Sequence, residues 1–141
     1  MAEDPFRSFN FKIEIQGVTE GHFVECTGFG IDIQAIPYRE AGTSQLIHRL
    51  PGRLEYSDIT LRYGLTQSTE LWEWLMQIIQ GTIERKNISI VLLQSNGSDE
   101  ATRWNLESAW PRSWRGAPLD ALGNEAAIEA LTLTFESLQR G

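Results

Sequence analysis

The sequence has very little of several residue types, and each shortage excludes a class of protein. It has one cysteine, Cys26, so neither an intrachain disulfide nor a cysteine-rich metal site can form. Only two of its twelve basic residues are lysines, and 19 acidic residues bring the formal net charge to −7. This balance argues against a nucleic-acid backbone as the main partner, because neutralising phosphates takes clustered lysine and arginine.

Long apolar runs are also missing. No stretch approaches the ~18 apolar residues that cross a bilayer. The first five residues lack the basic region and apolar stretch of a secretory signal. We therefore expect synthesis in the cytoplasm without a signal peptide, and we expect Cys26 to be a reduced, small, buried apolar residue.

What remains is the composition of one globular domain. The 141 residues contain 41% apolar and 22% charged residues, and a chain of this size can bury about two-thirds of its surface on folding. We predict a single domain over residues 1–141, with residues 1–8 as a mobile N-terminal arm. The sequence contains no internal repeat and no domain linker.

Alternation of apolar and polar residues predicts most of the chain to be β-strand. Asn96-Gly97 predicts a tight hairpin turn with positive φ at both positions, and Pro111 is expected to end the strand that follows it. Most connections are too short for parallel crossovers, so the fold class is mainly β, with two packed antiparallel sheets in a sandwich or barrel. The predicted strands cover residues 9–15, 29–35, 59–64, 88–93, 104–110 and 131–135.

One segment has helical periodicity. Ser68 or Thr69 can cap it, apolar residues recur at helical spacing from Leu71 to Ile79, and Gly81 is placed to end it. Apolar side chains occupy more than half of the helix circumference, so we expect other parts of the protein to cover this flanking helix on more than one side.

Residues 37–57 are predicted to form a loop of about 21 residues. A loop that long in a compact domain is usually functional or disordered. Leu46, Ile47, Leu50 and Leu54 argue against disorder and need a surface to cover them.

No catalytic or cofactor template is complete. His22 and His48 lie in separate segments, Cys26 has no orienting partner for nucleophilic chemistry, and Gly28-Phe29-Gly30 lacks the third glycine of a dinucleotide fingerprint. We predict no enzyme activity, no cofactor and no metal. Two rival interpretations stay open: a monomeric β-sandwich binding module, and an enzyme whose carboxylates meet across a cleft.

Tryptophan is plentiful by comparison. The five tryptophans either fill the core of a small β protein or anchor contacts between subunits, where this residue is enriched. They are Trp72, Trp74, Trp104, Trp110 and Trp114.

Several segments together resemble a known family. In chain order they are Ile36-Pro37-Tyr38-Arg39-Glu40-Ala41-Gly42, His48-Arg49-Leu50-Pro51-Gly52, Ile59-Thr60-Leu61-Arg62-Tyr63-Gly64, Leu71-Trp72-Glu73-Trp74 and Ala109-Trp110-Pro111. Over roughly residues 8–139 the chain resembles the tail tube proteins of contractile-tailed phages and of phage-derived contractile injection systems, which are related to the tube protein of type VI secretion. Tyr63 and residues 112–115 depart from the commonest family pattern, so phage tail and injection particle both stay open.

The resemblance implies a structural role. Six copies would close into a ring, and the rings would stack into a hollow tube that carries protein cargo, surrounded by a sheath, seated on a baseplate and tipped by a spike. The tube would be made in the bacterial cytoplasm as part of a phage tail-like particle, either released or anchored at a membrane, without inserting into the membrane or binding specific nucleic acid. Segment 37–57 would reach the neighbouring ring through Tyr38, Arg39, Glu40, Leu46, Ile47, His48, Arg49 and Leu50.

The net charge suggests a hypothesis about the lumen. Six copies would carry six times −7, or −42. If much of this charge faced the lumen, it would repel anionic cargo from the wall; the alternative spreads it over outer surfaces. The wet-face positions expected to line the lumen are Lys12, Glu14, Asp32, Gln34 and Arg62.

Overall fold

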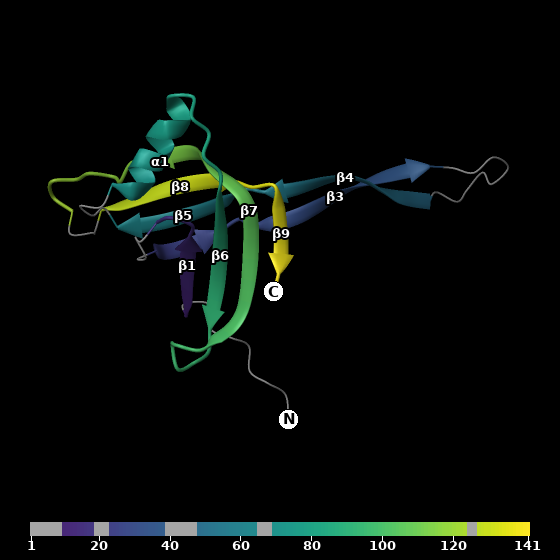
Figure 1. Cartoon of the computed structure of the whole chain (residues 1–141), viewed down its shortest axis with the longest axis horizontal. Helices are drawn as coiled ribbons and strands as arrows, with labels where there is room; N and C mark the ends of the chain where they lie inside the picture. The colour runs from purple at the N-terminus through teal and green to yellow at the C-terminus, as the bar shows by residue number, and fades with distance from the viewer. Residues whose placement is uncertain (1–9, 19–22, 39–47, 65–68, 124–126) are drawn as a thin grey trace.

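The computed structural model describes residues 10–18, 23–38, 48–64, 69–123 and 127–141. These residues form nine strands and one helix, whose arrangement Figure 1 shows. In chain order they are β1 (Phe11–Ile15), β2 (Phe23–Thr27), β3 (Gly30–Tyr38), β4 (His48–Ser57), β5 (Ile59–Gly64), α1 (Glu70–Ile79), β6 (Lys86–Leu93), β7 (Glu100–Arg115), β8 (Ile128–Thr134) and β9 (Ser137–Arg140).

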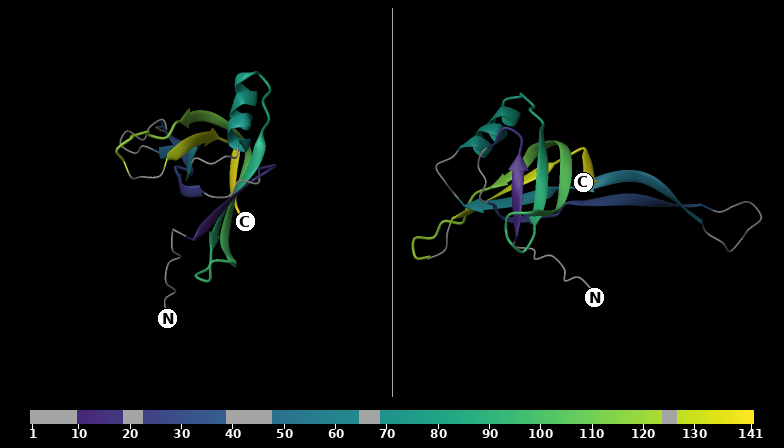
Figure 2. Two further views of the ribbon diagram at one scale, coloured as in Figure 1. Left: turned by 90° about the vertical axis from the view of Figure 1, so that its left-hand side faces the viewer. Right: turned by 60° about the horizontal axis from the view of Figure 1, so that its bottom comes forward.

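Seven of the strands form one antiparallel sheet that folds into two layers through β7. The strand order is β1-β6-β7-β8-β5-β2, and β9 pairs with β7. The first part of β7 pairs with β6 and β9, whereas the part from Trp110 onward pairs with β8. One extra residue of β7 lies opposite β6 where the layers meet, and Ser108 there has a φ of 57°. This bulge turns the strand from one layer to the other and confirms the predicted pair of packed antiparallel sheets (Figure 2).

The core lies between the two layers. Alternate residues of β1, β5 and β8 point inward, and β6 and β7 add further buried side chains, so both layers contribute to one cluster. Its fully buried members include Ile59, Leu61, Leu106, Leu131 and Leu133.

The helix begins and ends as the sequence predicts. Thr69 is the N-cap residue, although its hydroxyl donates to the Glu73 carboxylate at 3.0 Å and accepts no capping hydrogen bond from a backbone N–H. Gly81, with a φ of 95°, follows the last turn. Leu71 and Trp74 are buried, while Trp72 is exposed, so the chain itself covers one side of α1.

Two local predictions are wrong. β7 continues through Pro111 to Arg115, because a register shift beside this proline accommodates its missing N–H. In the hairpin between β6 and β7, Gly97 has positive φ but Asn96 does not. The Asn96 side chain instead accepts hydrogen bonds from the backbone N–H groups of the two residues after Gly97, which stabilises the turn another way.

The predicted loop over residues 37–57 is also wrong at both ends, since Pro37 and Tyr38 already belong to β3. Residues 48–57 form β4, which pairs with β3 as a separate two-stranded sheet. Neither face of this ribbon is consistently buried, so its sequence lacks the regular alternation that indicates a strand. Pro51, Gly52 and a bulge interrupt the pattern further. Residues 39–47 lie outside the described residues.

Candidate subunit interface

The two-stranded sheet of β3 and β4 projects from the body of the molecule (Figures 1 and 2). Its register pairs Gly30 with Ser57 at the base and Tyr38 with His48 at the far end. Six of its large apolar side chains are exposed, by between 37% at Tyr38 and 59% at Ile33. Exposed apolar patches of this kind are typical of surfaces that contact a protein, a membrane or a ligand. The six are Ile31, Ile33, Ile36, Tyr38, Leu50 and Leu54.

Four of the eight residues predicted to join neighbouring rings lie on the far half of this hairpin. The rings of Tyr38 and His48 stack with their centroids 5.3 Å apart. Leu50 lies opposite Ile36, and Arg49 lies opposite Pro37. The other four predicted residues are outside the described residues: Arg39, Glu40, Leu46 and Ile47.

The five residues predicted to line the lumen lie on three different surfaces. Lys12 and Glu14 are on the outer face of the layer that contains β1 and β6, with Lys12 Nζ 4.0 Å from Glu14 Oε1. Asp32 and Gln34 lie together on the polar side of the hairpin, beside a shallow hollow. Arg62 is on the outer face of the other layer, where it forms an ion pair with Glu25 at 3.2 Å.

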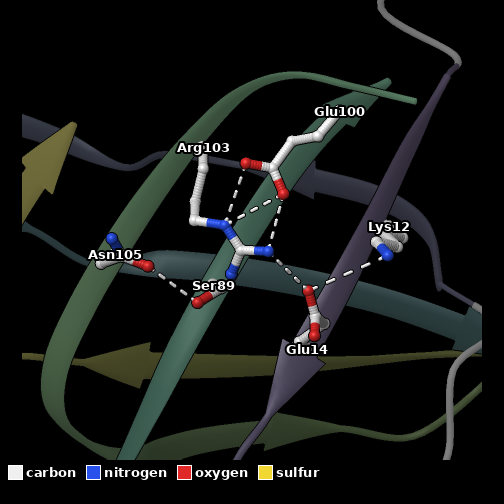
Figure 3. A network of polar contacts seen from close by, with 6 residues as sticks. All are labelled: Lys12, Glu14, Ser89, Glu100, Arg103 and Asn105. Carbon is white, nitrogen blue, oxygen red and sulfur yellow. Dashed lines mark hydrogen bonds and ion pairs between the residues drawn. The ribbon is translucent and has the colours of Figure 1, made fainter. Parts of the chain in front are cut away.

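The surface around Lys12 and Glu14 contains a network that sequence reasoning missed (Figure 3). Arg103 donates to Glu100 at 2.7 Å and to Glu14 at 3.1 Å, so β1 and β7 are joined across β6. The Arg103 hydrogen bond lowers the pKa of Glu100, and the same bond raises the pKa of Arg103. The alternation of apolar and polar residues predicts that these side chains are exposed to solvent. Only the order of the strands in the sheet shows that they are neighbours.

A second missed feature is an apolar cleft of about 670 Å³ on the open side of the sandwich. Val24, on its wall, is 59% exposed. Cys26 also lines the cleft, and burial raises the pKa of its thiol to about 12, in line with the predicted small apolar role. The lining residues are Phe11, Phe23, Val24, Glu25, Cys26, Thr27, Phe29, Ile90, Leu92 and Trp104. They come from four strands and a connection, so no local sequence motif indicates the cleft.

The tryptophans differ in exposure. Trp74 is in the core, and its indole N–H donates to the carbonyl oxygen of Glu84 at 2.7 Å. Trp72 is exposed on α1, and its ring meets that of Trp114 edge-on with centroids 5.0 Å apart. Trp104 and Trp110 are half-buried.

Within the described ranges, no group of three or more histidine, cysteine or acidic side chains could hold a metal ion. In the same part of the chain, no helix is long and apolar enough to cross a membrane.

The sequence profile of a known family matches almost the whole chain. The family is described as the T4-like virus tail tube protein gp19, and the match spans residues 7–139. The chain belongs to this tail tube family. It is a structural tube subunit, as the resemblance predicted.

Solved structures agree with the family assignment. One similar chain comes from the sheath-tube complex of the extracellular contractile injection system PVC in its extended state. The two are 28% identical with a TM-score of 0.87, and the match covers 99% of this chain and 93% of that one. Another comes from the cap that terminates the tube of the anti-feeding prophage, with 25% identity, a TM-score of 0.88, and coverage of 100% and 93%.

More distant relatives share the fold alone. Hcp1 from Flavobacterium johnsoniae is 14% identical with a TM-score of 0.58, and the match covers 93% of this chain and 94% of that one. No protein in the curated set matches the chain.

Proposed function

We propose that copies of this tail tube protein close into rings of six, and that the rings stack into a tube inside a contractile sheath. The observation that carries the proposal is the projecting β3–β4 hairpin, whose exposed apolar side chains have no cover within the described chain. Burying them against other copies would remove a large apolar area from water, at roughly 25 cal/mol per Å². A PVC sheath-tube complex and a six-fold symmetrised anti-feeding prophage baseplate contain chains of the same fold.

Sheet edges give a second reason for assembly. In the described part of the chain, β1 and β2 are the two ends of the strand order. Such edges are templates for pairing with another chain. A head-to-tail contact between copies closes when its rotation divides a full turn and continues as a filament when it does not. In a tube of stacked rings, the contacts within a ring close, and the contacts between rings continue as a filament.

Not all five residues predicted to line the lumen can lie on the same wall of one copy. Lys12 and Glu14 point away from the core on one layer, and Arg62 points away from it on the other. One wall therefore cannot contain both sets from the same copy. We propose that the lumen is lined by one of these two outer faces, with Asp32 and Gln34 near its seams, and that protein cargo passes along it. Side-chain density in a tube map identifies the lining, and a mainly neutral wall would contradict the charge hypothesis.

The proposed role is structural and not catalytic, in a phage tail-like particle with sheath, baseplate and spike partners. The experiment is to express the chain with the sheath and baseplate proteins of its own gene cluster and to image the particles by electron microscopy. We expect sheathed tubes with six-fold rings of this chain. Sheathed particles that lack the chain, with the chain recovered as a monomer, would contradict the proposal and favour a binding module.

A further inference from the structure

The turn that joins β6 and β7, residues 94–99, contains a chemically reactive pair. Among the asparagines of the sequence, Asn96 is the only one that precedes a glycine. Such a pair deamidates more readily than other asparagine pairs, because glycine has no Cβ to hinder attack of its backbone nitrogen on the asparagine amide. Every residue of the turn is exposed, so water reaches the pair. Figure 1 shows the turn at the end of these two strands that lies away from α1.

The side-chain amide of Asn96 is held at both of its ends. Its Oδ1 accepts hydrogen bonds from the backbone N–H groups of Ser98 and Asp99, each at 3.0 Å. Its Nδ2 donates to Oδ2 of Asp99 at 2.8 Å. The turn therefore uses an acceptor at one end of this side chain and a donor at the other, an arrangement that an amide supplies and an ionised carboxylate does not.

Backbone hydrogen bonds close the turn around the atoms that would react. The Gly97 N–H donates to the carbonyl oxygen of Gln94 at 2.9 Å, and the Gln94 N–H donates to the carbonyl oxygen of Asp99 at 2.7 Å. Deamidation requires the Gly97 nitrogen to lose its proton and to reach Cγ of Asn96. In the closed turn this proton is engaged and the Asn96 side chain is fixed. The reaction consequently requires the turn to open, and an exposed turn opens locally at low cost.

The reaction replaces the amide of Asn96 with a carboxylate. The Gly97 nitrogen gives its proton to a solvent base and bonds to Cγ of Asn96. The bond from Cγ to Nδ2 breaks, and Nδ2 leaves as ammonia with a proton taken from water. Water then opens the resulting cyclic imide at either of its two carbonyl carbons. One product is aspartate, and the other is isoaspartate, in which Cβ becomes part of the main chain.

Both products remove a contact on which the turn depends. An aspartate at this position has no N–H to donate to Asp99, so two carboxylates would face each other where a hydrogen bond now lies. Arg103, on the same strand as Glu100, cannot relieve the repulsion, because it is already paired with Glu100 and Glu14 (Figure 3). An isoaspartate lengthens the main chain and shifts the turn against the register of β6 and β7.

We propose that Asn96 is a site of spontaneous deamidation, that the closed β6–β7 turn slows this reaction, and that the product holds the turn open. Opening of the turn allows the reaction, and the reaction then favours the open turn. Because the reaction is irreversible, the modification accumulates in chains whose turn has opened. The inference concerns the chemistry of the chain itself and does not depend on the proposed tube function.

The first measurement follows the wild-type chain. The full chain is incubated at pH 8 in buffer and in urea, and mass spectrometry locates the modification in the tryptic peptide of residues 87–103. A sample taken at the start corrects for reaction during digestion. We expect product at Asn96 and none at Asn87, which precedes isoleucine in the same peptide. The rate in buffer should be at least about tenfold below the rate in urea, because the reaction follows the fraction of time for which the turn is open.

The second measurement compares variants of the turn by NMR hydrogen exchange of the Gly97 amide. Asn96→Asp places the product carboxylate in the turn, and exchange should become at least about tenfold faster than in the wild type. Combining Asn96→Asp with Asp99→Asn interchanges donor and acceptor and should restore slow exchange. Ser95→Asp is the matched control, because it adds a carboxylate at an exposed position of the same turn and leaves the pair intact, so exchange should stay slow.

Three outcomes overturn the inference. Equal rates at Asn96 in buffer and in urea would mean that the turn gives no protection. Slow exchange of the Gly97 amide in Asn96→Asp would mean that the product does not open the turn. Fast exchange in the double variant or in Ser95→Asp would mean that the facing carboxylates are not the cause. The wild-type measurement still tests the inference if a variant fails to fold. All of these outcomes leave the tube function standing, since imaging of sheathed particles tests it separately.

Discussion

Gly28→Ala should destabilise the chain far more than other glycine substitutions at similar backbone angles. Gly28 lies in the connection between β2 and β3 with a φ of 94°. A Cβ added there would come within 2.6 Å of the carbonyl oxygen of Asp58, the residue between β4 and β5. Gly81 has nearly the same angle, a φ of 95°, but an added Cβ would meet nothing within 4 Å. The pair therefore separates backbone strain from close packing.

The magnitudes follow from these two environments. A left-handed conformation costs an L-residue roughly 1–2 kcal/mol, and this cost applies to both alanine variants. Alanine also restricts the unfolded chain, which offsets about 0.4–1 kcal/mol in each case. Only Gly28→Ala must also displace a backbone carbonyl, and overpacking of this kind costs typically about 1–3 kcal/mol. We expect Gly28→Ala to be the less stable variant by about that amount.

Urea unfolding followed by tryptophan fluorescence measures the difference. The protein should be dilute, and the midpoint should be shown to be independent of its concentration, because assembly would add its own stabilisation. In thermal unfolding the two variants should differ by roughly 3–10 °C. Equal losses for Gly28→Ala and Gly81→Ala would refute the reasoning, since the contact with Asp58 would then carry no cost.

Three further predictions concern side chains. Trp74→Phe should cost about 1–3 kcal/mol in urea unfolding, because a smaller ring replaces the buried indole and the part-buried 2.7 Å hydrogen bond to the carbonyl oxygen of Glu84 is lost; a cost below about 0.5 kcal/mol would contradict that hydrogen bond. Cys26, whose burial raises its pKa to about 12, should react with a thiol reagent at pH 8 far more slowly in the native chain than in urea, and equal rates would contradict its burial. Arg103→Gln should raise the pKa of Glu100 towards its ordinary value in an NMR titration. Arg103 lowers the pKa of Glu100 in the folded chain, so the pair stabilises the fold above the unfolded pKa of Glu100, and this stabilisation is lost as the pH falls through the folded pKa. An unchanged Glu100 titration in Arg103→Gln would refute the pairing.

Most elements of the fold could be predicted because one face of each is buried in the core. Strands β5 and β8 alternate cleanly, since Leu61 and Leu131 point inward while Arg62 and Thr132 point outward. The helix was predictable from its apolar spacing and from Gly81. In each case the local sequence and the tertiary environment give the same periodicity.

In the elements that were not predicted, the local sequence pattern does not match the burial of the residues. β4 lies in a ribbon that the chain does not cover, so its apolar residues follow no single face. β2 is an edge strand with a bulge, and its residues Phe23–Thr27 show no alternation. The cleft joins residues that are far apart in the sequence, so only strand order could reveal it. The apolar residues of the long segment led the sequence analysis to the candidate interface, but the hairpin that this segment forms was not predicted.

The passage of β7 through both layers has a mechanical consequence. A tube driven forward by a contracting sheath experiences force along its wall, and a sandwich held by side-chain packing alone could shear between its layers. Here the strand that pairs with β6 in one layer continues without a break as the strand that pairs with β8 in the other. In the proposed tube, load that entered one layer would therefore reach the other through covalent bonds. It would pass through the bulge at Ser108, where β7 leaves one layer for the other.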